Sequence, residues 1–243
     1  MRLRDLLHFL RRTPLHPQWL LNDRKALSAW IKYHAQGVVL DIGCADRWIE
    51  QHLPHGSHYI GLDHWETGGK LYGSRPTVFA DAACLPLATA SCDTVILLEV
   101  LEHIKMPQDA LREIARVLRP GGHLLLSMPF LYPIHDAPHD YQRLTRHGLQ
   151  RDLANAGLEA SSVEERLSSI ETAVLLACLA LGASVVQSGK RAKRAFILAP
   201  AFLMLIPVFN VFGWIAGRVS PNWTAMTSGF RVLARKLPDS VAG

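Results

Sequence analysis

The chain has 243 residues, of which 49% are hydrophobic and 19% charged, and its formal net charge is +5 at pH 7. This length suffices for one complete α/β core and leaves little room for a second large domain. The four cysteines show no zinc-ligand spacing, which argues for a reducing, cytoplasmic environment. The positive charge favours an anionic partner, either a membrane surface or a nucleic acid.

The first twelve residues are basic and rich in leucine. Leucines recur there at helical spacing among four arginines, and Asp5 and His8 interrupt the apolar run, unlike in a secretory signal. We expect an N-terminal helix that caps the main fold. The alternative is a helix that lies on an anionic membrane.

From residue 27 onward, short apolar runs typical of buried strands alternate with longer segments of helical periodicity. The expected helices are Leu27–Tyr33, one around Trp48–Leu53, Pro107–Leu118 and Thr145–Ala156. The expected strands are Val38–Asp41, Tyr59–Leu62, Thr77–Phe79, Cys92–Leu98, His123–Ser127 and Leu158–Val163, with a loop at Glu66–Gly73 and a helix stop at Pro120-Gly121-Gly122. Such alternation predicts an open parallel sheet with helices on both faces.

The pattern changes after Val163. Thr172–Gly189 is 18 residues long and Ala195–Gly217 is 23 residues long, both without a charge, and the basic stretch Lys190–Arg194 separates them. A strand-like run returns only at Gly229–Lys236. We therefore expect an apolar helical insertion before the last strand.

Acidic residues stand where the first three expected strands end. Asp41 precedes a tight turn at Gly43, Asp63 follows 22 positions later, and Asp81 follows the third strand. The carboxyl ends of parallel strands meet at one edge of a sheet, where nucleotide-type ligands bind with their sugar hydroxyls on a carboxylate. The sequence therefore predicts such a ligand at this edge.

The motifs resemble, in order and spacing, those of the class I S-adenosylmethionine-dependent methyltransferases over Val38–Val163. They are Asp41-x-Gly43, Asp63, Asp81-Ala82, Leu85-Pro86, Cys92–Val95, Glu99–His103 and Leu118–Gly122. The resemblance implies an α/β fold, a Rossmann-like seven-stranded sheet with helices on both faces. The seventh strand, Gly229–Lys236, is then antiparallel, and the apolar insertion lies between strands six and seven. The expected divisions are residues 1–36 (cap), 37–164 (core), 165–220 (insertion) and 221–243 (closing strand).

The resemblance also implies S-adenosyl-L-methionine as the cofactor. It implies that Asp41, Gly43, Cys44 and Ala45 hold the methionine moiety and that Asp63 binds the ribose. Asp81 and Ala82 would then bind the adenine, and Leu98 and Glu99 would form the floor beneath the sulfonium. Ala45 and Arg47 stand where the family pattern has glycine. The added methyl group of Ala45 is tolerated if its φ stays negative, and we expect Arg47 to turn to solvent or to the methionine carboxylate. The alternative is a degenerate, non-catalytic domain.

Candidate catalytic groups follow strands four and five. Glu99, Glu102 and His103 form an E-x-x-E-H cluster. Similar clusters bind a divalent metal in ubiquinone-pathway O-methyltransferases and small-RNA 2′-O-methyltransferases. Methyltransferases without a metal carry it too, and we expect no metal here.

The loop after strand five supplies His135 and His139 as general bases, with His103 as a further proton carrier. The alternative for His139 is that His139-Asp140 only caps and orients the next helix.

The apolar insertion also indicates where the protein meets its methyl acceptor. A spanning hairpin would put Lys190–Arg194 on the far side of the membrane, against the positive-inside rule. We expect helices that lie on or dip into the cytoplasmic leaflet through residues 172–217; the alternatives are that spanning hairpin and a hydrophobic substrate lid.

The expected activity is therefore methyl transfer to oxygen of a small hydrophobic or lipid-linked acceptor, in the cytoplasm or at its membrane face. The alternatives are an RNA methyltransferase and a non-catalytic membrane scaffold. We expect no nucleic-acid partner, because the positive residues flank apolar helices and no RNA-binding module is visible.

Overall fold

The computed structural model describes residues 13–191 and 195–238, which form two compact units. The sheet unit comprises residues 24–130, 134–164 and 229–238, and the helical unit comprises residues 13–23, 131–133 and 165–228 without 192–194. Residues 13–23 therefore group with the insertion, whereas the sequence predicts a cap over residues 1–36. The leucine-rich segment 1–12 lies outside the described residues.

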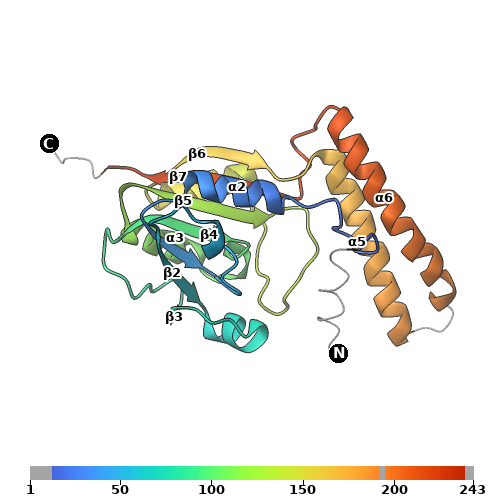
Figure 1. Ribbon diagram of the computed structural model, residues 1–243, viewed down its shortest axis with the longest axis horizontal. Helices are drawn as coiled ribbons and strands as arrows, with labels where there is room; N and C mark the ends of the chain where they lie inside the picture. Colours follow the sequence, from blue (N-terminus) through green and yellow to red (C-terminus); the bar gives the residue numbers. More distant parts are fainter. Residues whose placement is uncertain (1–12, 192–194, 239–243) are drawn as a thin grey trace. The chain divides into compact units, whose positions relative to one another are not determined.

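The sheet unit is built on seven strands in the order β3-β2-β1-β4-β5-β7-β6 (Figure 1). They are β1 (Val38–Ile42), β2 (His58–Asp63), β3 (Val78–Phe79), β4 (Cys92–Leu98), β5 (Leu118–Pro129), β6 (Leu158–Glu165) and β7 (Gly229–Lys236). The pairs β1–β2, β1–β4, β2–β3 and β4–β5 are parallel, and β7 runs antiparallel to β5. The predicted fold class is confirmed, including the antiparallel last strand.

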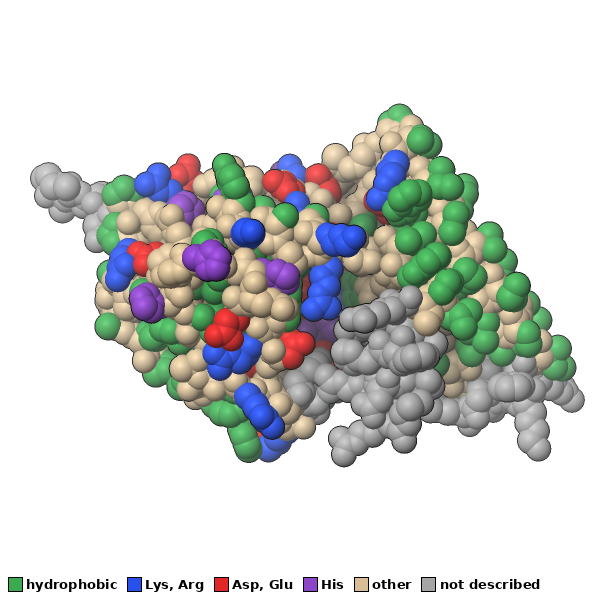
Figure 2. Space-filling model, in the orientation of Figure 1, with side chains coloured by type: hydrophobic (Ala, Val, Ile, Leu, Met, Phe, Trp, Pro, Cys, Tyr) green, Lys and Arg blue, Asp and Glu red, His purple; other side chains and the backbone are tan. Residues whose placement is uncertain are grey.

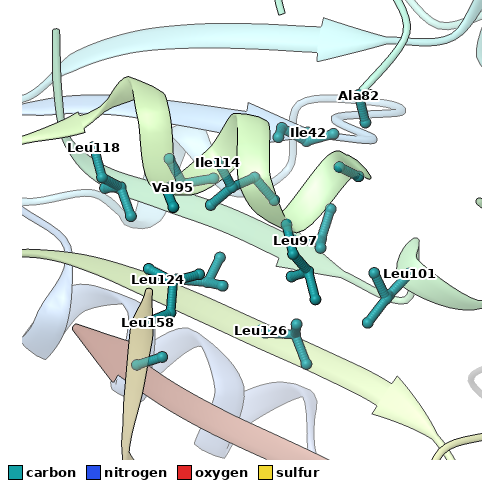
Figure 3. Packing of buried hydrophobic residues seen from close by; sticks show 14 of the residues in the cluster. Ile42, Ala82, Val95, Leu97, Leu101, Ile114, Leu118, Leu124, Leu126 and Leu158 are labelled. Carbon is teal, nitrogen blue, oxygen red and sulfur yellow. The ribbon is translucent and has the colours of Figure 1, made fainter. Parts of the chain in front are cut away.

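Helices cover both faces of this sheet, as predicted. They are α2 (Arg24–His34), α3 (Pro107–Val117) and α4 (Arg146–Asn155). Alternate residues of the central strands face opposite layers: Val95 and Leu97 of β4 pack in the layer that holds α3 and α4. Ile96 packs in the layer that holds α2. Figure 3 shows Ile114 of α3 beside Val95 and Leu97. Burial on both faces explains the continuous apolar run of β4.

Two sequence predictions about local structure are wrong. The expected loop at Glu66–Gly73 is largely a π-helix, η2 (Trp65–Tyr72), and the helix expected around Trp48–Leu53 is only the 3-10 turn η1 (Glu50–His52). Helix α3 stops at Val117, before Pro120-Gly121-Gly122 as predicted, and these three residues belong to β5, which already begins at Leu118. A Cβ at Gly122 would lie 2.9 Å from the Arg119 carbonyl oxygen and 3.0 Å from that of Asp93. Glycine there lets β5 approach β4 across an irregular register.

The helical unit contains α5 (Ser169–Arg191), the 3-10 turn η4 (Ala195–Leu198) and α6 (Ala199–Val219), between β6 and β7 as predicted. Ser169–Gln187 and Ala199–Val219 are long and apolar enough to cross a membrane by length and composition alone. The chain re-enters the sheet at its carboxyl edge, because Gly229 of β7 is the partner of Pro129, the last residue of β5.

Candidate active site

The chain makes a tight turn directly after β1. The backbone N–H groups of Gly43 and Cys44 both donate to the Leu62 carbonyl oxygen, at 2.8 and 3.1 Å. Gly43 has φ +77°, and a Cβ there would lie 2.3 Å from Cγ2 of Val100. Only glycine therefore allows this approach between the turn and the segment after β4.

Two residues of the turn are in the left-handed region without being glycine. Ala45 has φ +45° and Arg47 has φ +58°, so the condition of a negative φ at Ala45 is not met. Such a conformation costs an L-residue about 1 kcal/mol or more. The Arg47 guanidinium pairs with Glu50 at 3.1 Å and lies over the Tyr59 ring at 5.0 Å from its centroid. The Arg47 side chain thus contacts η1 through Glu50 and β2 through Tyr59, and about one third of it is exposed.

Asp41 is almost completely buried at the end of β1. The Tyr59 hydroxyl donates to Oδ2 of Asp41 at 2.7 Å. Gly61, the β2 partner of Asp41, leaves the space for this contact, since a Cβ there would lie 3.1 Å from the Tyr59 hydroxyl oxygen. Burial raises the pKa of Asp41 to about 7, although the Tyr59 hydrogen bond opposes the shift. Tyr59 was not among the predicted site residues, and the glycine within a strand was its only sequence signal.

Asp63 joins three segments at the end of β2. Its Oδ2 accepts from the Ala45 N–H at 3.1 Å, and its Oδ1 accepts from the His64 N–H at 2.8 Å. The backbone of η2 runs against the same carboxylate, because a Cβ at Gly68 would lie 2.1 Å from it. A carboxylate offers about four acceptor positions, so these two hydrogen bonds leave acceptor capacity for a ligand.

Asp81 lies at the same edge, since β3 pairs with β2 through Asp63 and Phe79. Its Oδ1 accepts from the Ala83 N–H at 2.9 Å, its side chain is exposed, and the neighbouring Ala82 is buried. The structure thus brings all three predicted aspartates to the carboxyl edge of neighbouring strands.

The end of β4 is fixed by β5. Leu98 pairs with Ser127, and the next residue, Glu99, takes φ +55°. The Glu99 N–H donates to the Ser127 carbonyl oxygen at 3.0 Å, and the Ser127 hydroxyl donates to Oε1 of Glu99 at 2.8 Å. Ser127 was not among the predicted site residues; the pairing of strands four and five was the signal for it.

Glu102 is fully buried in the short 3-10 helix η3 (Leu101–His103). Neither of its carboxyl oxygens has a hydrogen-bond partner among the described residues. Burial, and secondarily the nearby charge of Glu99, raise the pKa of Glu102 to about 9. Its Oε1 lies 3.7 Å from Nε2 of His103 and 3.8 Å from Nε2 of His135.

In both histidines an oxygen atom of the protein lies next to Nδ1 and orients the ring. Nδ1 of His103 lies 2.5 Å from the His139 carbonyl oxygen, and Nδ1 of His135 lies 3.3 Å from Oδ2 of Asp140. Arg143 pairs with Asp140 and lowers the pKa of that carboxyl to about 2, so Asp140 stays ionised. Nδ1 of His103 donates to the His139 carbonyl oxygen, so its Nε2 carries a lone pair on the side of Glu102. Nδ1 of His135 also lies 3.4 Å from Nη2 of Arg143, and its Nε2 faces the same Glu102 carboxyl.

The group Glu102, His103 and His135 therefore fits two kinds of chemistry. One ligand atom from each residue lies within 4.8 Å of the others, a donor set that suits a divalent cation. The same arrangement suits proton transfer by an imidazole. The expectation that the chain holds no metal stays a prediction.

His139 differs from the other two predicted catalytic histidines. Its contact with His103 is through the backbone carbonyl, and its ring Nδ1 lies 3.4 Å from the Tyr141 hydroxyl. The alternative that His139-Asp140 caps the next helix is wrong, because Thr145 is the N-cap of α4 and its Oγ1 accepts from the Gly148 N–H.

Comparisons with known proteins agree with this arrangement. Residues 40–126 match a family described as a methyltransferase domain. A ubiquinone biosynthesis O-methyltransferase of Marinobacter nauticus is 30% identical over 149 residues, covering 49% of this chain and 63% of that protein. The chain thus spans less than two thirds of this relative's length.

Solved structures share the fold. An S-adenosylmethionine-dependent methyltransferase from Mesorhizobium loti is similar with a TM-score of 0.51 at 16% identity, covering 90% of this chain and 97% of that one. A SAM-dependent methyltransferase from Thermotoga maritima is similar with a TM-score of 0.56 at 14% identity, covering 96% and 97%.

The left-handed conformation of Ala45 generates a stability prediction. Ala45→Gly should raise the free energy of unfolding by about 0.5–1 kcal/mol, because relief of the strain outweighs the added chain entropy. Ala154→Gly, in the exposed part of α4, should lower it by about 1 kcal/mol. Urea denaturation measures both, and a loss of stability in Ala45→Gly would contradict the assignment of strain.

Burial of Asp41 predicts a pH dependence of stability. Because its folded pKa is raised from 3.8 to about 7, the folded state binds the proton more tightly, and stability should fall as pH rises from about 4 to about 7. Asp41→Asn should remove a decline on the order of 4 kcal/mol, whereas Asp46→Asn, at an exposed carboxylate of the same turn, should retain it. Denaturation across this pH range checks the difference, and parallel pH curves for both variants would refute it.

Proposed function

The core of this chain is a class I S-adenosylmethionine-dependent methyltransferase domain, and we propose that the chain transfers the methyl group of this cofactor to an oxygen of a small hydrophobic or lipid-linked acceptor. The observation that carries the proposal is the convergence of Asp41, Asp63 and Asp81 on the carboxyl edge of β1, β2 and β3. The acceptor capacity left on Asp63 fits the cofactor.

Each part of the cofactor would contact residues at the end of a different strand. Asp41 and the turn Gly43–Ala45 would bind the methionine moiety, Asp63 the two ribose hydroxyls, and Asp81 with Ala82 the adenine. Leu98 and Glu99 would lie beneath the sulfonium. The bound cofactor supplies an electrophilic methyl group that is already activated by the positive charge on sulfur.

The protein must then remove a proton from the acceptor hydroxyl as the new C–O bond forms. His135 is the proposed base, since its imidazole lies beside Glu102 and the ionised Asp140 next to Nδ1 stabilises the imidazolium that results. His103, oriented by the His139 carbonyl oxygen, is the second proton carrier. Glu102, whose pKa is about 9, is a neutral carboxyl between them at neutral pH.

A divalent cation held by Glu102, His103 and His135 is the second candidate for activating the acceptor. The unpartnered oxygens of the buried Glu102 favour it. Such an ion would lower the pKa of the acceptor hydroxyl.

The hydrophobic class of the acceptor rests on two observations. The relative noted above is named for ubiquinone biosynthesis, and the apolar helical unit is joined to the carboxyl edge of the sheet through Gly229. We propose that the protein works at the cytoplasmic face of a membrane, with the helical unit as its contact. An RNA methyltransferase would instead show salt-dependent RNA binding, and a non-catalytic scaffold would fail to bind the cofactor.

Asp63→Ala tests the donor site. Losing two charge-assisted hydrogen bonds should weaken S-adenosylmethionine binding by about 30- to 100-fold in calorimetry. Asp109→Ala, exposed on α3, should bind as wild type does. If the wild-type chain shows no heat of binding, the methyltransferase proposal fails and the scaffold alternative stands.

His135→Gln tests the base, with His139→Gln as its matched control. His135→Gln should lower kcat by about 100-fold or more with cofactor affinity unchanged, whereas His139→Gln should retain turnover because its carbonyl oxygen remains. Labelled-methyl transfer to fractionated lipid and aqueous extracts is the assay. Activity that a chelator abolishes and a divalent cation restores would assign Glu102, His103 and His135 to a metal instead.

A further inference from the structure

An ordinary surface helix exposes polar side chains and buries apolar ones, whereas α6 does the reverse. Its exposed side is entirely apolar from Ala199 to Gly217 and continues to Val219, with Arg218 as the one charged residue beside it. We define the outer face of α6 as Met204, Leu205, Val208, Val211, Phe212, Ile215 and Val219, which are 39–77% exposed. Figure 2 shows hydrophobic side chains gathered over this part of the helical unit. A contiguous apolar surface of this kind marks an interaction site.

The opposite, inner face of α6 holds the one polar side chain that lies between Ala199 and Gly217. Asn210 is fully buried; its Oδ1 accepts from the Leu20 N–H at 3.2 Å, and its Nδ2 donates to the carbonyl oxygens of His16 and Ile206. Asn210 is thus the point where the irregular segment Thr13–Asn22 is fastened to the middle of α6. This segment carries polar side chains such as Gln18 and Asn22.

The two helices form one tightly packed hairpin. A Cβ at Gly213 would lie 2.9 Å from Cγ1 of Val174, and a Cβ at Gly217 would lie 2.4 Å from Cγ of Glu171. These glycines stand four residues apart on α6, the spacing that lets helices approach closely in apolar surroundings. The hairpin is therefore closely packed, with segment 13–22 on its inner side and the outer face of α6 uncovered among the described residues.

This arrangement excludes a hairpin that crosses the bilayer. A crossing would place the middle of α6 at the centre of the hydrocarbon, and the non-helical backbone of Thr13–Asn22 would lie there with it. Exposed irregular backbone does not occur in lipid, because its N–H and C=O groups lose their water. The basic stretch Lys190–Arg194 would also have to be carried to the far side.

We infer that the helical unit is a monotopic anchor, in which the outer face of α6 inserts into one leaflet of an anionic membrane while Asn210 and segment 13–22 stay on the water side. The inference rests on the membrane contact proposed above and specifies its face and depth.

In the sequence, positive charges flank α6 on both sides. Lys190, Arg191, Lys193 and Arg194 precede it in the sequence, and Arg218 lies near its C-terminal end, over the Trp214 ring at 4.2 Å from the centroid. Cations beside an apolar helical face bind the head groups of anionic lipids, and tryptophan favours the same interface. This charge pattern selects a lipid surface over a second copy of the same chain, whose charges would repel.

Vesicle flotation of the full chain tests the outer face. Wild type should float with vesicles of phosphatidylcholine and phosphatidylglycerol, and less with phosphatidylcholine alone. Phe212→Gln should reduce the partition coefficient by about tenfold, whereas Tyr33→Gln, at an even more exposed aromatic of α2 in the sheet unit, should leave it unchanged. Val208→Gln provides an independent variant on the same face, and circular dichroism confirms that each variant is folded.

Thiol labelling distinguishes one leaflet from a crossing. Gln187→Cys near the end of α5, with the exposed Cys84 replaced by Ser, should react with a membrane-impermeant maleimide when the protein is bound to intact vesicles. Protection until detergent is added would show a spanning hairpin and overturn the inference.

Three further outcomes would also overturn it. The first is flotation that Phe212→Gln and Val208→Gln leave unchanged. The others are a wild-type chain that does not float, and a wild-type chain that forms a dimer through this face without lipid. Calorimetry with S-adenosylmethionine on the same preparations keeps the proposals separate. Absent cofactor binding with intact flotation refutes the methyltransferase activity only.

Discussion

The carboxylate of Asp63 is the contact on which the carboxyl edge of the sheet depends. It accepts from the N–H of Ala45 after β1 and from that of His64 after β2, and it lies against the backbone of η2 at Gly68. One side chain therefore fixes the positions of the three segments that would surround a ligand. Ala45 donates this hydrogen bond while its own φ is in the left-handed region.

Buried acids set the chemistry at the same edge. Asp41 and Glu102 are both held away from water, and burial raises the pKa of each carboxyl well above its ordinary value. Such placement costs folding free energy unless a ligand, a proton or a cation compensates, which is why perturbed acids concentrate at functional sites. Asp140 shows the contrast: paired with Arg143 it stays ionised and orients His135.

The helical unit distributes apolar and polar side chains in the opposite way to the sheet unit. In the sheet unit apolar side chains from both faces of β4 are buried, whereas α6 buries Asn210 and exposes Phe212 and Ile215. Water does not stabilise such a surface, and a hydrocarbon phase does. The two units therefore suit two different solvents, which is consistent with a catalytic domain that meets a hydrophobic acceptor at a membrane.

The sequence by itself determined the alternation of strands and helices, the insertion and the three aspartates, because periodicity, turn residues and motif spacing are local properties of the chain. Its resemblance to a known family implied the antiparallel β7. It could not reveal that Tyr59 reaches Asp41 past Gly61, that Ser127 holds Glu99, or that His135 rather than the ring of His139 joins Glu102 and His103. Nor could it show that Asn210 fastens residues 13–22 to α6 and leaves one helical face uncovered. These contacts join residues far apart in the chain, and only the tertiary structure decides which of many chemically suitable side chains come within reach.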